Sequence, residues 1–295
     1  MDFGPFLLLA SLEGLVMAAV LALTAAGLSL VFGVMRVVNV AHGEFFMLGA
    51  VAAWFITDAL PGPAYMGFIA ALIAAPFIVG GIAALADTLI LKRLNYDPDA
   101  TIVATIGLLY IFQQLALSFY GPDARPVAPP FDFRIQFPWF GYSGYKLAVI
   151  GASVVILLGL WAIMTRSRFG LVMRATQYDR ETARAFGINV DRVYAGVFAL
   201  GAALAAVAAV LIVPIQQAHY LMGGDPLLLS FIVVIIGGLG SVKGAVAGSL
   251  LYGMSIAFAP AYLPADYTYY SIILTFVVLA VVLAVRPFGL FGKAE

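Results

Sequence analysis

Three polar residues stand close together in an otherwise apolar stretch, and they are the first candidates for chemistry. The segment RVVNVAHGEFFMLG, residues 36–49, contains Asn39, His42 and Glu44. Polar side chains in apolar surroundings are costly and usually face a cavity or a neighbouring helix. We therefore expect these residues to line a path for a polar solute. The alternative is structural: Asn39 caps a helix, and His42 with Glu44 form a local hydrogen-bonded joint. If the stretch lines a path, Glu44 is expected to stay charged beside Arg36, in a pair that holds the break open.

Further amide side chains occur in other apolar stretches. Gln113 and Gln114 are adjacent in one, and Gln216 and Gln217 end another, shortly before His219. Neutral amides would offer hydrogen bonds to a polar solute without holding it by charge, so all four glutamines are candidates for a translocation pathway. The alternative is hydrogen bonding between helices, which contributes about 1 kcal/mol or less per bond.

The same residues give little support to catalysis. The chain has no cysteine and two histidines, which leaves no thiol nucleophile and no Cys/His metal site. Only His42 and Glu44 approach an acid–base pair, and nothing nearby completes a site. We expect no enzyme, no metal and no bound cofactor. An ion-driven carrier is a competing hypothesis, in which buried Glu44 and Asp87 would bind the coupling ion.

The elements that hold these residues are predicted to be membrane-spanning helices. Hydrophobic residues make up 64% of the 295 residues and charged residues 10%, whereas a soluble domain carries about 25% charged residues. Apolar segments occur at 14–33, 38–57, 65–91, 101–119, 147–164, 193–213, 227–240, 244–260 and 269–285. The prediction is a single all-α, polytopic membrane domain over 1–295 with about eight or nine hydrophobic segments. Segments 38–57, 227–240 and 244–260 are expected to be short or broken.

Glycines mark the predicted helix breaks. Gly43 interrupts the stretch 36–49, and Gly237, Gly238 and Gly240 interrupt the stretch 231–253. Helices broken near the membrane middle commonly line transport sites. Because the two broken stretches occupy similar positions in the two halves of the chain, they indicate an internal repeat that matches 36–49 with 231–253.

Basic residues set the predicted orientation. The loop 165–192 is rich in arginine, Lys92 and Arg93 flank another loop, and Arg286 and Lys293 lie near the end of the chain. Placing these on the cytoplasmic side puts the N-terminus outside and the C-terminus inside. The loop 120–146 is rich in aromatic residues, which favours an interfacial position on the outer side.

A short capped helix is predicted within the loop 165–192. Thr176-x-x-Asp179 resembles a capping box, and Gly187 suits a helix C-cap. The charged residues between the caps would point outward: Arg180, Glu181 and Arg184. Ala183 and Phe186 would share another face. A helix lying along the membrane surface suits the docking of another protein, and the alternative is an ordinary basic loop.

Three stretches together resemble the branched-chain amino acid permeases of bacterial ABC importers, of the Liv H type. They are LSLVFGVMRVVNVAHGEFFMLGA, MRATQYDRETARAFGINVDR and GGLGSVKGAVAGSLLYG, and the resemblance covers nearly the whole chain in the right order. It implies a multi-pass permease subunit in a bacterial inner membrane, which admits branched-chain or other hydrophobic amino acids. Similar members carry urea or short amides, and that alternative stays open.

The resemblance also implies the partners. Two membrane subunits, expected to be different homologues, would meet two cytoplasmic ATPases that bind ATP and magnesium, and an extracytoplasmic binding protein would deliver the solute. The Gly-rich run GGLGSVKG lacks the Lys-Ser/Thr ending of an ATP-binding loop, so this chain would bind no nucleotide. The balanced charge gives no sign of a nucleic-acid partner. The loop 165–192 would engage the ATPase through Arg174, Gln177, Arg180, Glu181, Arg184, Phe186 and Gly187.

Overall fold

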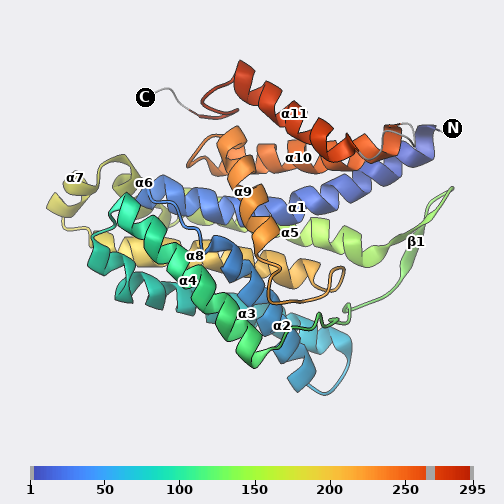
Figure 1. Ribbon diagram of the computed structural model, residues 1–295, viewed down its shortest axis with the longest axis horizontal. Helices are drawn as coiled ribbons and strands as arrows, with labels where there is room; N and C mark the ends of the chain where they lie inside the picture. The colour runs from blue at the N-terminus through green and yellow to red at the C-terminus, as the bar shows by residue number, and fades with distance from the viewer. Residues whose placement is uncertain (1–2, 264–269, 293–295) are drawn as a thin grey trace.

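Helices make up most of the molecule in the computed structural model, which describes residues 3–263 and 270–292 (Figure 1). The helices are α1 (Phe3–Met35), α2 (His42–Ala59), α3 (Ala64–Leu89), the 3-10 helix η1 (Leu91–Leu94), α4 (Pro98–Phe119), α5 (Gly144–Arg166), α6 (Arg168–Tyr178), α7 (Arg180–Ala185), α8 (Val190–Ile212), α9 (Gly224–Gly237), α10 (Val242–Tyr262) and α11 (Ser271–Val285). A small antiparallel hairpin, β1 (Arg134–Gln136) with β2 (Gly141–Ser143), precedes α5.

The long helix α1 runs through the middle of the bundle, between α10 and α8 (Figure 1). Small residues allow this close packing. Gly14 lies against the backbone of Gly253 on α10, and Gly27 lies against the backbone of Gly201 on α8. Glycine at a helix contact lets two backbones approach closely. The most apolar part of α1 is consequently almost entirely buried.

Six of the described helical stretches are long and apolar enough to cross a membrane, which confirms the predicted polytopic helical fold. They contain α1, α3, α4, α5, α8 and α10. The segments 38–57 and 227–240 correspond to the shorter helices α2 and α9. The prediction that 244–260 is short or broken is wrong, because α10 continues for 21 residues. Its glycines serve packing: Gly244 lies against Gly237 and Gly253 against Gly14.

Helices α1, α2 and α3 make contacts equivalent to those of helices α8, α9 and α10, respectively. Helix α1 packs on α10 as α8 packs on α3, and α2 packs on α3 as α9 packs on α10. The start of α5 shows that α1 and α8 run in opposite directions. Its Tyr145 donates to the carbonyl of Leu211 near the end of α8, while its Lys146 pairs with Glu13 in the first half of α1. Opposite directions with exchanged contacts make an inverted repeat.

This repeat differs in register from the one that the glycines indicate. The segment 36–41, between α1 and α2, corresponds to the segment 213–223, between α8 and α9. The link between α9 and α10, at 238–241, then corresponds to the link between α2 and α3, at 60–63. The match of 36–49 with 231–253 is therefore off by one helix.

Charge distinguishes the two ends of the bundle. One end, called the basic end from here on, lies at the left in Figure 1 around α6 and α7 and carries most of the described Lys and Arg residues. These are Arg36, Lys92, Arg93, Arg166, Arg168, Arg174, Arg180, Arg184, Arg192, Lys243 and Arg286. The opposite end holds the start of α1 and the β hairpin. There the guanidinium of Arg125 lies 4.2 Å from the ring centroid of Trp54 and 4.7 Å from that of Tyr120.

Candidate functional site

An extended segment interrupts the helices between α1 and α2 and passes through the interior. It begins at Arg36, whose φ is +55°. Asn39 is 1% exposed, and its Oδ1 accepts a hydrogen bond of 3.1 Å from the backbone N–H of Ala41. The N–H of Val40 donates to the Thr105 hydroxyl on α4 at 3.2 Å. These side chains replace part of the hydrogen bonding that a helix would supply, which is a requirement for irregular backbone away from water.

His42 and Glu44 fasten the start of α2 to two other helices. The Nε2 of His42 lies 2.9 Å from the carbonyl oxygen of Thr24 on α1, and Gln113 Nε2 on α4 donates to Glu44 Oε1 at 2.9 Å. His42 and Glu44 are 0% and 1% exposed. The expected pairing of Glu44 with Arg36 is wrong, because Gln113 occupies that role and Arg36 lies at the basic end. The two side chains form interior joints and line none of the cavities described below.

The start of α2 meets the start of α9 through two glycines. A Cβ on Gly43 would overlap the carbonyl oxygen of Gly223, and a Cβ on Gly223 would overlap that of Gly43. Gly43 belongs to the first turn of α2. The helix break therefore precedes Gly43, at residues 36–41, and the prediction of a break at Gly43 is wrong. The glycine permits contact between two helix starts that correspond in the inverted repeat.

The glycines after α9 end that helix and join it to the basic end. Helix α9 ends at Gly237, and Gly238 and Gly240 have φ values of +103° and +77°, which only glycine adopts readily. The carbonyl of Gly237 accepts a hydrogen bond from the N–H of Phe291 at 3.0 Å. Gly240 lies against Gly33 near the end of α1. This link thus connects α9, α1 and the chain after α11.

Two short helices, α6 and α7, cover the basic end. Ser167 caps α6 by accepting a bond of 2.9 Å from the N–H of Gly170. Asp179 caps α7 through Oδ1, which accepts from the N–H groups of Glu181 at 2.9 Å and Thr182 at 3.1 Å. The cap residue is therefore Asp179, and Thr176 is not part of a capping box: it lies inside α6 and donates to Val172. Hydrogen bonds from Thr182 hold the pKa of Asp179 below its usual value, so the cap is charged at neutral pH.

The C-terminal end of α7 turns at Gly187. Its φ is +82°, its N–H donates to the carbonyl of Arg184, and the N–H of Ile188 donates to that of Ala183. This is the bonding of a left-handed helix C-cap. Ala183 is buried, whereas Phe186 is 83% exposed, so the prediction that they share a face is wrong. Phe186 and Tyr178, which is 90% exposed, present two aromatic rings on the outside of the basic end.

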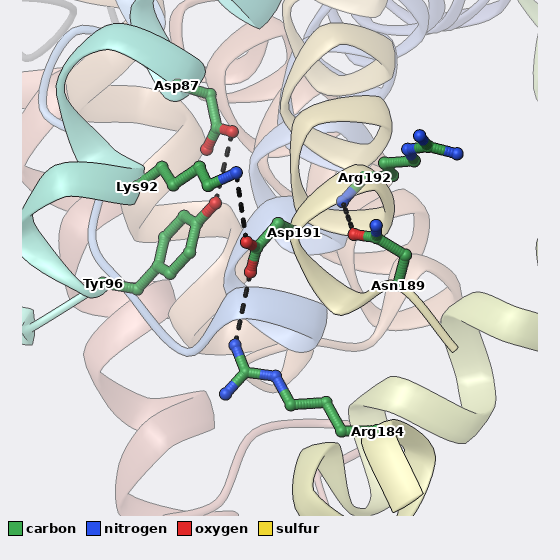
Figure 2. A network of polar contacts seen from close by, with 7 residues as sticks. All are labelled: Asp87, Lys92, Tyr96, Arg184, Asn189, Asp191 and Arg192. Carbon is green, nitrogen blue, oxygen red and sulfur yellow. Dashed lines mark hydrogen bonds and ion pairs between the residues drawn. The ribbon is translucent and has the colours of Figure 1, made fainter. Parts of the chain in front are cut away.

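Asp191 in the first turn of α8 connects α7 to the end of α3 (Figure 2). Its carboxylate lies 3.2 Å from Lys92 Nζ in η1 and 3.3 Å from an Arg184 guanidinium nitrogen in α7. Beside Lys92, the Tyr96 hydroxyl donates to the buried Asp87 carboxylate at 3.4 Å. Exposed ion pairs contribute about 0–1 kcal/mol. The network therefore matters mainly because it fixes α7 relative to η1 and α8.

A cavity of about 610 Å³ lies at the basic end between α1, α4, α6 and α7. Arg36, Tyr96, Gln177, Arg180 and Glu181 are among its lining residues. A neighbouring hollow of about 520 Å³ lies between the end of α1, α9 and the segment after α11, and Arg36 and Gln177 line it as well. Of the other residues expected at this end, Arg174 is exposed and donates to the carbonyl of Met164.

A third cavity, of about 270 Å³, lies beside the middle of α1. Of the glutamines predicted to line a path, only Gln216 lines this cavity, together with His219. Gln217 is exposed next to it, Gln114 is exposed on the outer face of α4, and Gln113 is bonded to Glu44. Asp225 also lines the cavity and was not predicted. It could have been found, because it is the only carboxylate between Asp191 and Asp266 in a long apolar sequence.

Comparison with known proteins shows to which family this chain belongs. The model of the family described as branched-chain amino acid transport system / permease component matches residues 10–283. The chain belongs to this permease family. It is 31% identical to the high-affinity branched-chain amino acid transport system permease protein LivH of Salmonella typhimurium, over 96% of this chain and 94% of that protein. It is 30% identical to BraD of Pseudomonas aeruginosa, a permease protein of the same description, over 96% and 95%.

Membership in this family fits the membrane fold. A more distant relative, the probable branched-chain amino acid transport permease protein LivH of Methanocaldococcus jannaschii, is 26% identical over 95% of this chain and 91% of that protein. The permease relatives and the six apolar helices of the described residues together show a multi-pass protein of the bacterial inner membrane.

Proposed function

We propose that this permease is the membrane-spanning subunit of an ATP-driven importer of branched-chain amino acids. The observation that carries the proposal is the match to the branched-chain permeases along nearly the whole chain. A binding protein outside the cell would deliver the amino acid, and separate subunits would bind and hydrolyse ATP. A second permease subunit, expected to be a different homologue, would complete the membrane part.

The basic end supplies the surface on which an ATPase would act. Positive charge gathers on the cytoplasmic side of inner-membrane proteins, so α6 and α7 would lie inside the cell and the loop 120–146 outside. We propose that α7 docks into the ATPase. Exposed Phe186 and Tyr178 would provide apolar contact, while Arg174, Arg180 and Glu181 would provide polar contact and Gly187 the turn. Arg184, held by Asp191, would pass movement of α7 to α8 and η1.

Reconstitution tests the proposal. The permease, its partner permease, the ATPases and the binding protein are placed in liposomes, and uptake of radiolabelled leucine is measured with and without ATP inside. We expect leucine uptake that requires ATP and all subunits, and no uptake by this permease alone. Uptake of urea in preference to leucine would contradict the assigned solute, and uptake by the chain alone would show an ion-driven carrier.

A further inference from the structure

The cavity beside the middle of α1 lies deep within the membrane part of the molecule. Met17, Val20, Leu21 and Thr24 line it from α1, and Tyr252 lines it from the centre of α10. A helix rises about 1.5 Å per residue, so these residues lie roughly 16 Å or more from the end of α1 at Met35. That distance is about half the thickness of the hydrocarbon core, which is about 30 Å.

A charged residue is exposed at this depth. Asp225 lies in the first turn of α9, directly after the contact between Gly223 and Gly43, and its side chain is exposed. An aspartate in contact with lipid near the centre of a bilayer is energetically costly. The face of α9 that carries Asp225 therefore does not lie against lipid. It faces water or a second subunit, as a wall of the solute path would.

The lining of the cavity combines one carboxylate, four other polar side chains and an apolar wall; the four are those of Thr24, Gln216, His219 and Tyr252. Gln216 and His219 come from the segment between α8 and α9. The apolar side chains come from several helices: Val20, Leu21, Phe46, Ile212 and Leu229. A volume of about 270 Å³ is small, since sites for drug-sized ligands measure about 300–1,000 Å³. It suits a single small molecule with one apolar and one charged part.

We propose that this cavity is a transit site for a zwitterionic aliphatic amino acid, with Asp225 as the group that recognises its ammonium. The carboxylate of the solute would be met by the Gln216 amide and the His219 ring, and its branched side chain would lie on the apolar wall. This inference rests on the proposed function as an amino acid importer. Neutral solutes such as urea have no ammonium for Asp225 to pair with.

The first test removes the charge of Asp225. Asp225→Asn is compared with Asp58→Asn, which changes an exposed carboxylate at the opposite end of the bundle from the basic end. In the reconstituted complex, we expect Asp225→Asn to lower leucine uptake about tenfold or more, since hydrogen bonds to charged groups are stronger than those between neutral groups. Asp58→Asn should leave uptake unchanged. If the unmodified complex imports leucine and Asp225→Asn imports it equally well, the transit site is disproved while the importer stands.

A second test separates recognition from stability, because an aspartate in a first helical turn also stabilises the helix. The chain has no cysteine, so Leu229→Cys provides a single thiol in the cavity. We expect a cationic thiol reagent to react with it faster than an anionic one of similar size, and leucine to slow both reactions. Adding Asp225→Asn should remove the preference for the cation. A preference that persists without Asp225, or a thiol that leucine does not protect, would overturn the proposal.

Discussion

At the scale of single residues, the interior of this permease depends on which polar groups find partners. Glu44 meets Gln113, His42 meets the carbonyl of Thr24, and Asn39 caps its own segment. A buried polar group without a partner is costly, so these contacts hold the interruption between α1 and α2 in one conformation. These contacts support the structural alternative that the sequence offers for these residues, while among the described residues Asn39 Nδ2, His42 Nδ1 and Glu44 Oε2 are buried without a hydrogen-bond partner.

The contact between Gly43 and Gly223 gives a prediction about stability. Gly223→Ala places a methyl group on the Gly43 carbonyl oxygen, whereas nothing lies within 4 Å of a Cβ on the adjacent Gly224. Overpacking a tight contact costs about 1–3 kcal/mol. We expect Gly223→Ala to lower the temperature of unfolding of the purified permease in detergent, and Gly224→Ala to leave it nearly unchanged. Equal unfolding temperatures for the two variants would show that the contact is not tight.

At the scale of elements, the sequence predicts the type of each helix better than its junctions. Apolar runs of sufficient length identify α1, α3, α4, α5 and α8 directly. The glycines of α10 and Gly43 of α2 mislead, because a glycine at a close helix contact and a glycine at a break look alike along the chain. Only the partner helix, far away in sequence, distinguishes the two cases. Asp225 stands out in the sequence as an isolated carboxylate, but its place in a cavity wall follows only from the depth and exposure of the start of α9.

The cap of α7 gives a prediction about coupling. Asp179→Ala removes the acceptor for two N–H groups, while Asp179→Ser retains a side chain that caps helices well. In the reconstituted importer, we expect the alanine variant to hydrolyse ATP but transport fewer solute molecules per ATP, and the serine variant to behave nearly normally. Equal ratios in all three proteins would show that the order of α7 is unimportant for coupling.

The charge of Asp179 sets the pH range of this cap. Because its pKa is lowered in the folded protein, the stabilisation from the charged cap is fully present above the ordinary aspartate pKa of about 3.9. It is lost as the pH falls through the lowered value. Coupling that depends on Asp179 should therefore not change between about pH 6 and pH 8. If the number of solute molecules transported per ATP does change with pH in that range, other groups are responsible.

At the scale of the whole molecule, the two ends of the bundle differ in charge, and this predicts the orientation. Asp132 lies in the exposed loop at the opposite end and Tyr178 is exposed at the basic end. In intact cells, we expect Asp132→Cys to react with a membrane-impermeant thiol reagent and Tyr178→Cys to react only after the cells are opened. The native chain, which lacks cysteine, is the blank. The reverse pattern would invert the assigned topology.

The meeting of α2 and α9 has a consequence for how the protein is made. Helix α2 is not among the stretches long and apolar enough to insert alone, and it carries His42 and Glu44 at its buried start. Its neighbour at that point, Gly223, is synthesised about 180 residues later. During translation, α2 would thus leave the insertion machinery before Gln113, which binds Glu44, and Gly223, which packs on Gly43, exist. The early helices should wait in a shielded site, or in a provisional arrangement at the membrane surface, until the second half of the repeat arrives.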